Sequence, residues 1–132
     1  MKFAKLVFLI AGIYGLIVLL PAYFTETQVG RDFPPAITHP EYYYGFVGVG
    51  VAWQVLFIIL SRDPPRYRPM MIPAIVEKFS FVIAAIPLFL QHRMPIPPLI
   101  GAGIDLILGV LFVLAYLRTA AVKSGNESWS NK

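Results

Sequence analysis

Charged residues are scarce in this sequence, and cysteine is absent. Asp, Glu, Lys and Arg make up 14% of the 132 residues, whereas a soluble domain contains about a quarter. So few charges cannot cover a water-facing surface, which excludes a disordered chain, an ordinary soluble enzyme and a nucleic-acid-binding domain. Without cysteine, the chain forms no disulfide, uses no thiol chemistry and holds no iron–sulfur cluster or cysteine-ligated zinc. The composition therefore indicates an integral membrane protein.

Apolar residues are abundant and are arranged in long runs. They make up 58% of the chain, and the mean hydropathy is +0.70. Each run is about the 20 residues that a helix needs to cross ~30 Å of hydrocarbon, and none alternates as the strands of a membrane barrel do. We therefore predict an all-α integral membrane four-helix bundle that forms one domain over residues 1–123. The predicted spans are residues 6–24, 42–61, 70–90 and 98–117.

Basic residues flank these runs unevenly. Lys2 and Lys5 precede the first run, three arginines separate the second from the third, and three basic residues follow the fourth. Only Arg31 and Arg93 fall in the other loops. The positive-inside rule then predicts a multi-pass protein of the cell (inner) membrane with both termini in the cytoplasm, ending in a polar, disordered tail over 124–132. The first run starts like a signal peptide but is too long and has no small-residue cleavage site, so we expect a retained helix.

Three charged residues lie inside the predicted spans, namely Glu77, Lys78 and Asp105. A charge at the centre of a membrane helix costs ~2.5–3.5 kcal/mol, so such residues normally face the bundle interior and find partners there. Counting about 1.5 Å per residue from the helix ends places Glu77 and Lys78 at the same depth as two polar residues on the first two spans. Those residues are Tyr14 and Gln54. The predicted inner cluster consists of Tyr14, Trp53, Gln54, Glu77 and Lys78.

Asp105 lies about 10 Å below the opposite surface by the same count. We expect it to meet His39, Glu41 or His92 at an outer mouth of the bundle. A metal site needs three or four convergent ligands, and the spacing of these residues does not demand one, so we predict neither a metal nor a cofactor. The tyrosines at 42–44 are typical of an aromatic belt at a membrane interface, with ligand contact as the alternative.

Small residues form stripes on three of the predicted helices. Gly101, Asp105 and Gly109 recur every four residues and share one face, so we expect Asp105 to face a helix rather than lipid. Glycine allows a neighbouring backbone to approach closely. We predict that the stripes pack within the chain, with a homodimer face as the alternative. The other two stripes are Gly12 with Gly15, and Gly45 with Gly48 and Ala52.

The buried polar residues allow several functions. We interpret the chain as a non-enzymatic accessory or scaffold subunit of a membrane-protein complex or homo-oligomer, held by buried polar contacts. The alternative is a binder of, or an enzyme on, an apolar small molecule such as a quinone, a sterol-like lipid or a carotenoid, with Glu77 or Asp105 on the pocket wall. A third hypothesis is proton-coupled transport by an oligomer. No phosphate-binding loop, nucleophile elbow or zinc-protease motif favours an enzyme. The expected partner is the lipid bilayer, and nucleic acid is not expected.

Three segments carry a resemblance to known families. AGIYGL at 11–16, the basic loop after the second span and DLILGVLFVLAYLRT at 105–119 resemble the DoxX-like small four-helix bacterial membrane proteins. That resemblance implies the fold more than the function. PAIVEKFSFVIAAIPLF at 73–89 is similar to the EXPERA group, which implies a compact bundle with buried acids around a lipid-like ligand. Neither resemblance carries over site residues.

Overall fold

The computed structural model describes residues 2–120, which are mainly helical and contain no strand. Four helices are long, and three shorter helical segments connect them. The predicted tail, residues 124–132, lies outside the described residues. The long helices are α1 (Lys2–Leu19), α3 (Pro40–Arg62), α4 (Met71–Leu90) and α5 (Ile96–Arg118). The short segments are η1 (Leu20–Phe24), α2 (Glu26–Asp32) and η2 (Arg68–Met70).

The prediction of four membrane-length helices is confirmed. Together with η1 and η2, each of the four helical stretches is 23 residues long and apolar enough to cross a bilayer. Each begins two to four residues earlier than its predicted span, because the added first residues include charged residues or proline, which an apolar run leaves out. Proline at the start of α3 and α5 suits a first turn, where the backbone N–H has no partner within the helix.

The connection between the first two spans contains a helix that was not predicted. This helix, α2, has only seven residues and no apolar periodicity, so its sequence resembles a polar loop. Its polar side chains stabilise it locally. Gln28 donates a hydrogen bond to Asp32 one turn later, and Glu26 lies in the first turn, where the helix dipole favours an acid.

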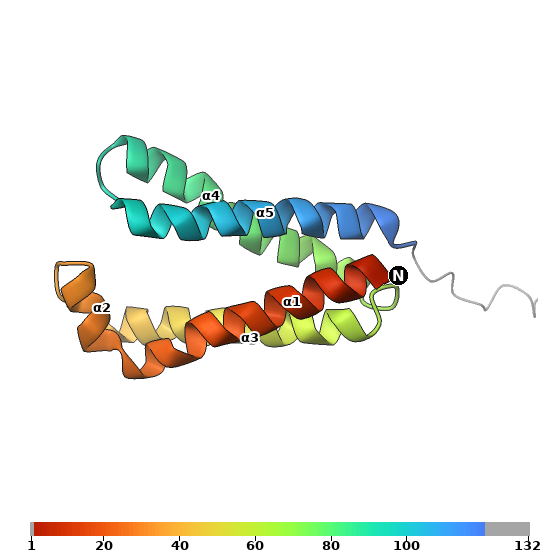
Figure 1. The fold of residues 1–132 in the computed structure, drawn as a ribbon, viewed down its shortest axis with the longest axis horizontal. Helices are drawn as coiled ribbons and strands as arrows, with labels where there is room; N and C mark the ends of the chain where they lie inside the picture. The colour runs from red at the N-terminus through yellow and green to blue at the C-terminus, as the bar shows by residue number, and fades with distance from the viewer. Residues whose placement is uncertain (1, 121–132) are drawn as a thin grey trace, which may run out of the picture.

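The long helices pack as two pairs, α1 with α3 and α4 with α5, and the pairs lie closer together at the end where α1 begins (Figure 1). Within the first pair, Gly12 and Gly15 lie so close to α3 that an added Cβ would meet Gln54 or Ile58. Within the second pair, a Cβ on Gly109 would lie 3.0 Å from the ring of Phe79 on α4. Packing within the chain is therefore confirmed at these three glycines.

The stripe on α3 does not pack in this way. Gly45 has open space around it and Ala52 is exposed, while a Cβ on Gly48 would meet only the Tyr23 hydroxyl, at 3.5 Å. At 100° per residue, this stripe lies on the face opposite to the buried Gln54 and Phe57. The prediction that this stripe packs within the chain is therefore wrong for the described residues, because α3 turns its other face to its neighbours.

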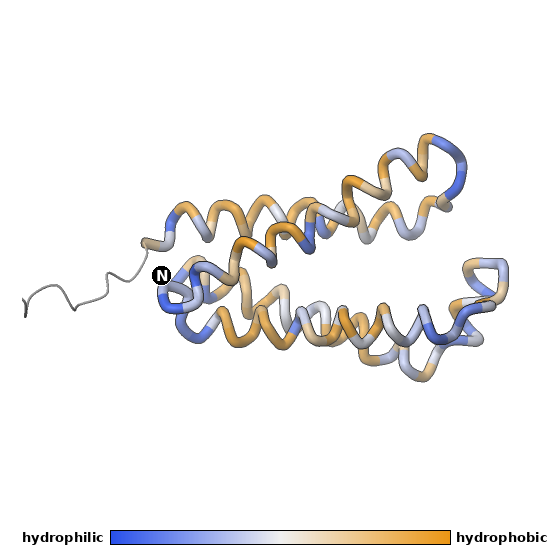
Figure 2. Tube along the Cα trace, turned by 180° about the vertical axis from the view of Figure 1, so that it is seen from behind, coloured by the Kyte–Doolittle hydropathy of each residue, from blue (hydrophilic) through white to orange (hydrophobic). Residues whose placement is uncertain are grey.

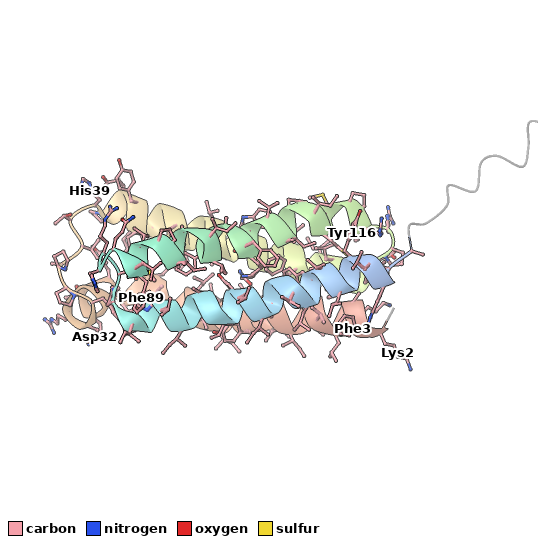
Figure 3. The ribbon with its side chains drawn as sticks, turned by 90° about the horizontal axis from the view of Figure 1, so that it is seen from above. Lys2, Phe3, Asp32, His39, Phe89 and Tyr116 are labelled. Carbon is pink, nitrogen blue, oxygen red and sulfur yellow. The ribbon has the colours of Figure 1, made fainter. Side chains whose placement is uncertain are left out.

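A hydrophobic core fills one half of the bundle. Phe8, Phe57 and Phe112 come from three helices, are fully buried, and have ring centroids 4.4–6.2 Å apart. This half includes the end at which α1 begins and α5 ends, since the Arg118 guanidinium lies 4.7 Å from the Phe3 ring. Figure 3 shows Lys2, Phe3 and Tyr116 at this end, and Asp32 and His39 at the other. Figure 2 shows apolar residues along the long helices and hydrophilic residues at both ends.

Candidate functional site

Glu77, Lys78 and Asp105 form an ion cluster between α4 and α5. The Lys78 ammonium donates a hydrogen bond to Asp105 Oδ1 at 3.0 Å and lies 3.2 Å from Glu77 Oε2. It also lies 5.4 Å from the centroid of the Phe57 ring on α3. The Lys78 side chain is 7% exposed, and the two carboxylate side chains are 23% exposed each. The lysine is therefore enclosed, while both acids keep an open side.

The glycine spacing on α5 positions this cluster. At Gly109 the missing side chain leaves room for Lys78, whose Cβ lies 3.4 Å from where a Cβ on Gly109 would be. Asp105 lies one turn earlier on the same face of α5, about 6 Å along the axis. The stem of Lys78 is long enough to cover that turn, which brings its ammonium to the carboxylate. Asp105 therefore faces helix α4, as the stripe of small residues predicts.

Glu77 is less well satisfied than Asp105. Its Oε2 atom is buried and accepts no hydrogen bond, although Lys78 Nζ lies at ion-pair distance. The ammonium is directed at Asp105, so its attraction to Glu77 is electrostatic and poorly aligned. Ionised carboxylates only accept hydrogen bonds, and each has about four acceptor positions. The cluster therefore has acceptor capacity left over and carries a formal charge of −1.

A cavity of about 310 Å³ lies beside the ion cluster, between all four long helices. We call it the interhelical cavity. It lies in the half of the bundle away from the phenylalanine core, and its wall is mostly apolar. Small-molecule sites in proteins have volumes of about 300–1,000 Å³, with apolar walls and few polar groups. The cavity is lined by Ala11, Tyr14, Gly15, Val18, Leu19, Phe46, Gly50, Gln54, Glu77, Lys78, Phe81, Gly101, Ile104, Asp105 and Leu108.

Four of the five residues of the predicted inner cluster line this cavity. Tyr14, from α1, is 41% exposed and lies on the wall. Gln54 is 4% exposed, packs over Gly15 and donates a hydrogen bond to the Gly50 carbonyl at 3.1 Å. It thus holds α1 against α3 and also lines the cavity. Trp53 is not on the cavity wall, because its side chain packs against the hydrophobic core beside Phe57, with ring centroids 6.3 Å apart.

The predicted outer cluster does not form around Asp105, which is occupied by Lys78. His39 instead lies 3.1 Å from Glu41 on the exposed end of α3, and its ring lies beside Tyr42. His92 is exposed in the turn after α4. In the described residues, no three His, Asp or Glu side chains come close enough to hold a metal ion.

Two of the three clustered tyrosines fasten the same end of the bundle. The Tyr43 hydroxyl donates a hydrogen bond to the Ala22 carbonyl of η1 at 2.7 Å. The Tyr44 hydroxyl donates to Glu26 of α2 at 2.8 Å. These contacts tie the start of α3 to η1 and to α2, so the two side chains have a structural role.

Sequence reasoning missed the apolar wall of the cavity. A signal was present, because the wall residues of α1 (11, 14, 15, 18 and 19) and of α5 (101, 104, 105 and 108) follow the spacing of one helix face. Each of these faces contains a polar residue that was singled out, Tyr14 or Asp105. The residues three and four positions away from such a polar residue were therefore the candidates for the wall.

The chain matches no protein-family model, no curated protein and no solved structure. The resemblances to the DoxX-like and EXPERA groups stay predictions.

Proposed function

We propose that this chain is a multi-pass membrane protein that binds an apolar small molecule in the interhelical cavity. The polar end of the molecule contacts Glu77 and Asp105. The observation that carries the proposal is a cavity of about 310 Å³ with both carboxylates on an otherwise largely apolar wall. A scaffold subunit held only by polar contacts would need no such volume. The contact of Lys78 with both acids also stabilises the bundle, so the same residues serve as clasp and as binding site.

Two glycines on α5 provide a test with a matched control. Gly101 lines the cavity and Gly103 does not, and a Cβ added at either position meets nothing within 4 Å. The Gly101→Phe variant therefore fills the cavity without a backbone clash, and Gly103→Phe adds the same ring outside it. Each protein is purified in a mild detergent, and mass spectrometry identifies the small molecules that it retains.

We expect the unchanged protein and Gly103→Phe to retain the same apolar molecule, and Gly101→Phe to lose it. Equal amounts of that molecule in all three samples would show that it sits elsewhere, on the lipid-facing surface. Absence of any enriched molecule from all three, also after incubation with a total lipid extract, would count against the proposal.

We also infer that the end of the bundle with Lys2 faces the cytoplasm of a cell (inner) membrane. Besides Lys2, this end carries Lys5, Arg62, Arg66, Arg68 and Arg118. The chain has no cysteine, so a single introduced cysteine reports its side without background. An impermeant maleimide applied to intact cells should label Thr38→Cys, and should label Ala120→Cys only after permeabilisation. The reverse pattern would invert the orientation.

A second function, as an accessory subunit, is favoured by the exposed stripe Gly45, Gly48 and Ala52 on α3. Small residues in a membrane helix allow close packing of another helix. Cysteine at position 52 should then cross-link to a second copy or to a co-purifying partner. Cysteine at position 46, which is exposed and lies about 120° around α3 from Ala52, serves as the control. Equal cross-linking from the two positions would refute a specific docking face.

A further inference from the structure

We propose that the molecule bound in the interhelical cavity is an apolar amine in its ammonium form, with its nitrogen against the exposed parts of the Glu77 and Asp105 carboxylates. This inference rests on the proposed binding function and names the chemical class of the ligand. It is carried by the charge of the cavity wall, by the enclosure of Lys78 and by the open acceptor positions of the two acids.

The formal charge of the wall is −1. Glu77 and Asp105 contribute two negative charges and Lys78 one positive charge, and every other wall residue is uncharged at neutral pH. A net charge among apolar side chains is only partly solvated and therefore unfavourable, and a cation of opposite sign lowers that cost. The cavity is therefore electrostatically complementary to a monovalent organic cation.

Lys78 is not available to an anionic ligand or to a neutral hydrogen-bond acceptor. Its ammonium already contacts both carboxylates, at 3.0 Å and 3.2 Å, and its side chain is 7% exposed. An anionic head group would have to displace one of these acids and would then lie beside its charge. A neutral carbonyl, as in a quinone, would need to reach an ammonium whose side chain is only 7% exposed. The lysine therefore offers an acceptor ligand little accessible surface.

The carboxylates favour a ligand that donates hydrogen bonds. Glu77 Oε2 is buried beside Lys78, but both acids line the cavity and keep 23% of their side chains exposed, so a ligand can reach the exposed part of each carboxylate. An ammonium group carries several N–H donors and makes charge-assisted bonds to carboxylates, which are about twice as strong as neutral ones. An alcohol also donates, but with one hydrogen and no charge. Donor number and charge therefore both favour the amine.

The rest of the wall suits the apolar body of such a molecule. Phe46 and Phe81 contribute rings from α3 and α4, and Tyr14 contributes one from α1. Aromatic faces attract cations as well as apolar groups. The remaining lining residues are aliphatic side chains and glycines, apart from Gln54, whose amide is already bonded to the Gly50 carbonyl.

Three probes with one body and different heads test the inference. They are 1-adamantanemethylamine, 1-adamantanemethanol and 1-adamantanecarboxylate, which present an ammonium, a hydroxyl and a carboxylate on the same apolar cage. Binding to the full chain in lipid nanodiscs is measured by titration calorimetry, and the signal of empty nanodiscs is subtracted to remove partition into lipid. We expect the amine to bind about tenfold more tightly than the alcohol, or better, and the carboxylate not to bind.

Variants separate this inference from the proposed function. Glu77→Gln and Asp105→Asn preserve shape and remove one negative charge each, so each should weaken amine binding about tenfold and bring it level with alcohol binding. Gly101→Phe should abolish binding of both probes, and Gly103→Phe should leave it unchanged.

One outcome would refute the amine and keep the binding function. In it, the unchanged protein binds the alcohol as tightly as the amine or more tightly, and Gly101→Phe still blocks binding. Amine binding that Glu77→Gln and Asp105→Asn both leave intact would also refute the amine. Binding of every probe that Gly101→Phe does not affect, or no binding of any probe, would overturn the binding function itself.

Discussion

Replacing Lys78 by methionine removes the cation that holds two acids together inside the bundle. Methionine preserves most of the side-chain volume, so the variant tests charge and hydrogen bonding rather than packing. Polar contacts between membrane helices are worth about 0.6 kcal/mol on average and at most about 1.7. The two contacts of Lys78, at 3.0 Å and 3.2 Å, are thus worth about 1–3 kcal/mol together.

The acids that remain add to this loss. Removing one partner of a buried ion pair costs about 3–5 kcal/mol in soluble proteins, because the other charge stays buried and unpaired. Here the carboxylates are 23% exposed, so cavity water compensates for part of that charge. We therefore expect Lys78→Met to lower the free energy of unfolding by about 3 kcal/mol. Lys5→Met, at an exposed site on α1, should change it by less than about 0.5 kcal/mol.

The measurement is unfolding by sodium dodecyl sulfate in mixed micelles, followed by far-ultraviolet circular dichroism. A double-mutant cycle with Asp105→Asn should give a coupling energy of about 1 kcal/mol or more for the Lys78–Asp105 pair. The triple variant Glu77→Gln, Lys78→Met, Asp105→Asn leaves no charge in the ion cluster and should recover much of the lost stability. A Lys78→Met protein as stable as Lys5→Met, or a coupling energy near zero, would refute the clasp.

Three further substitutions test the packing, each measured by the same unfolding assay. Gly109→Ala places a methyl group 3.0 Å from the Phe79 ring and should lower the free energy of unfolding by about 1–3 kcal/mol. Gly101→Ala has nothing within 4 Å and should leave it unchanged. Equal effects of the two would contradict the close approach of α4 and α5. Phe112→Ala empties a fully buried position between Phe8 and Phe57 and should lower the free energy of unfolding by about 3 kcal/mol. A loss below about 1 kcal/mol would show that this core is loosely packed. Tyr43→Phe removes the hydrogen bond to the Ala22 carbonyl and should lower the free energy of unfolding by about 1 kcal/mol. Tyr42 is exposed, so Tyr42→Phe should cause no change. Equal effects of the two would show that the Tyr43 hydrogen bond does not stabilise the bundle.

The spans could be predicted from the sequence because length and hydropathy alone decide them. The same is true of the charged residues, since any charge in such a span is costly enough to stand out. Their pairing could not be predicted. Counting residues from the helix ends assigns Glu77 and Lys78 to one depth and Asp105 to another, which separated the partners into two clusters. The count treats side chains as points, and Lys78 reaches a full turn along α5.

The facing of α3 shows a second limit. Its small-residue stripe and its buried face are both apolar, so composition does not distinguish the side that meets lipid from the side that meets helices. What decides it is Gln54, whose side chain fits over Gly15 and turns the opposite face, with Gly45 and Ala52, outward. A polar residue in the middle of an apolar helix was therefore better evidence for orientation than the glycines were.

The distribution of side-chain sizes explains why the cavity forms where it does. At the end with Lys2, phenylalanines from three helices meet and fill the space between the pairs. Beyond the ion cluster, the inward faces of α1, α3 and α5 carry Gly15, Gly50 and Gly101 instead. Gln54 covers the first of these glycines and Leu19 the second, but nothing covers Gly101. The unfilled volume therefore extends to α5 beside Asp105, so a ligand that fills it would bring its polar end to a carboxylate.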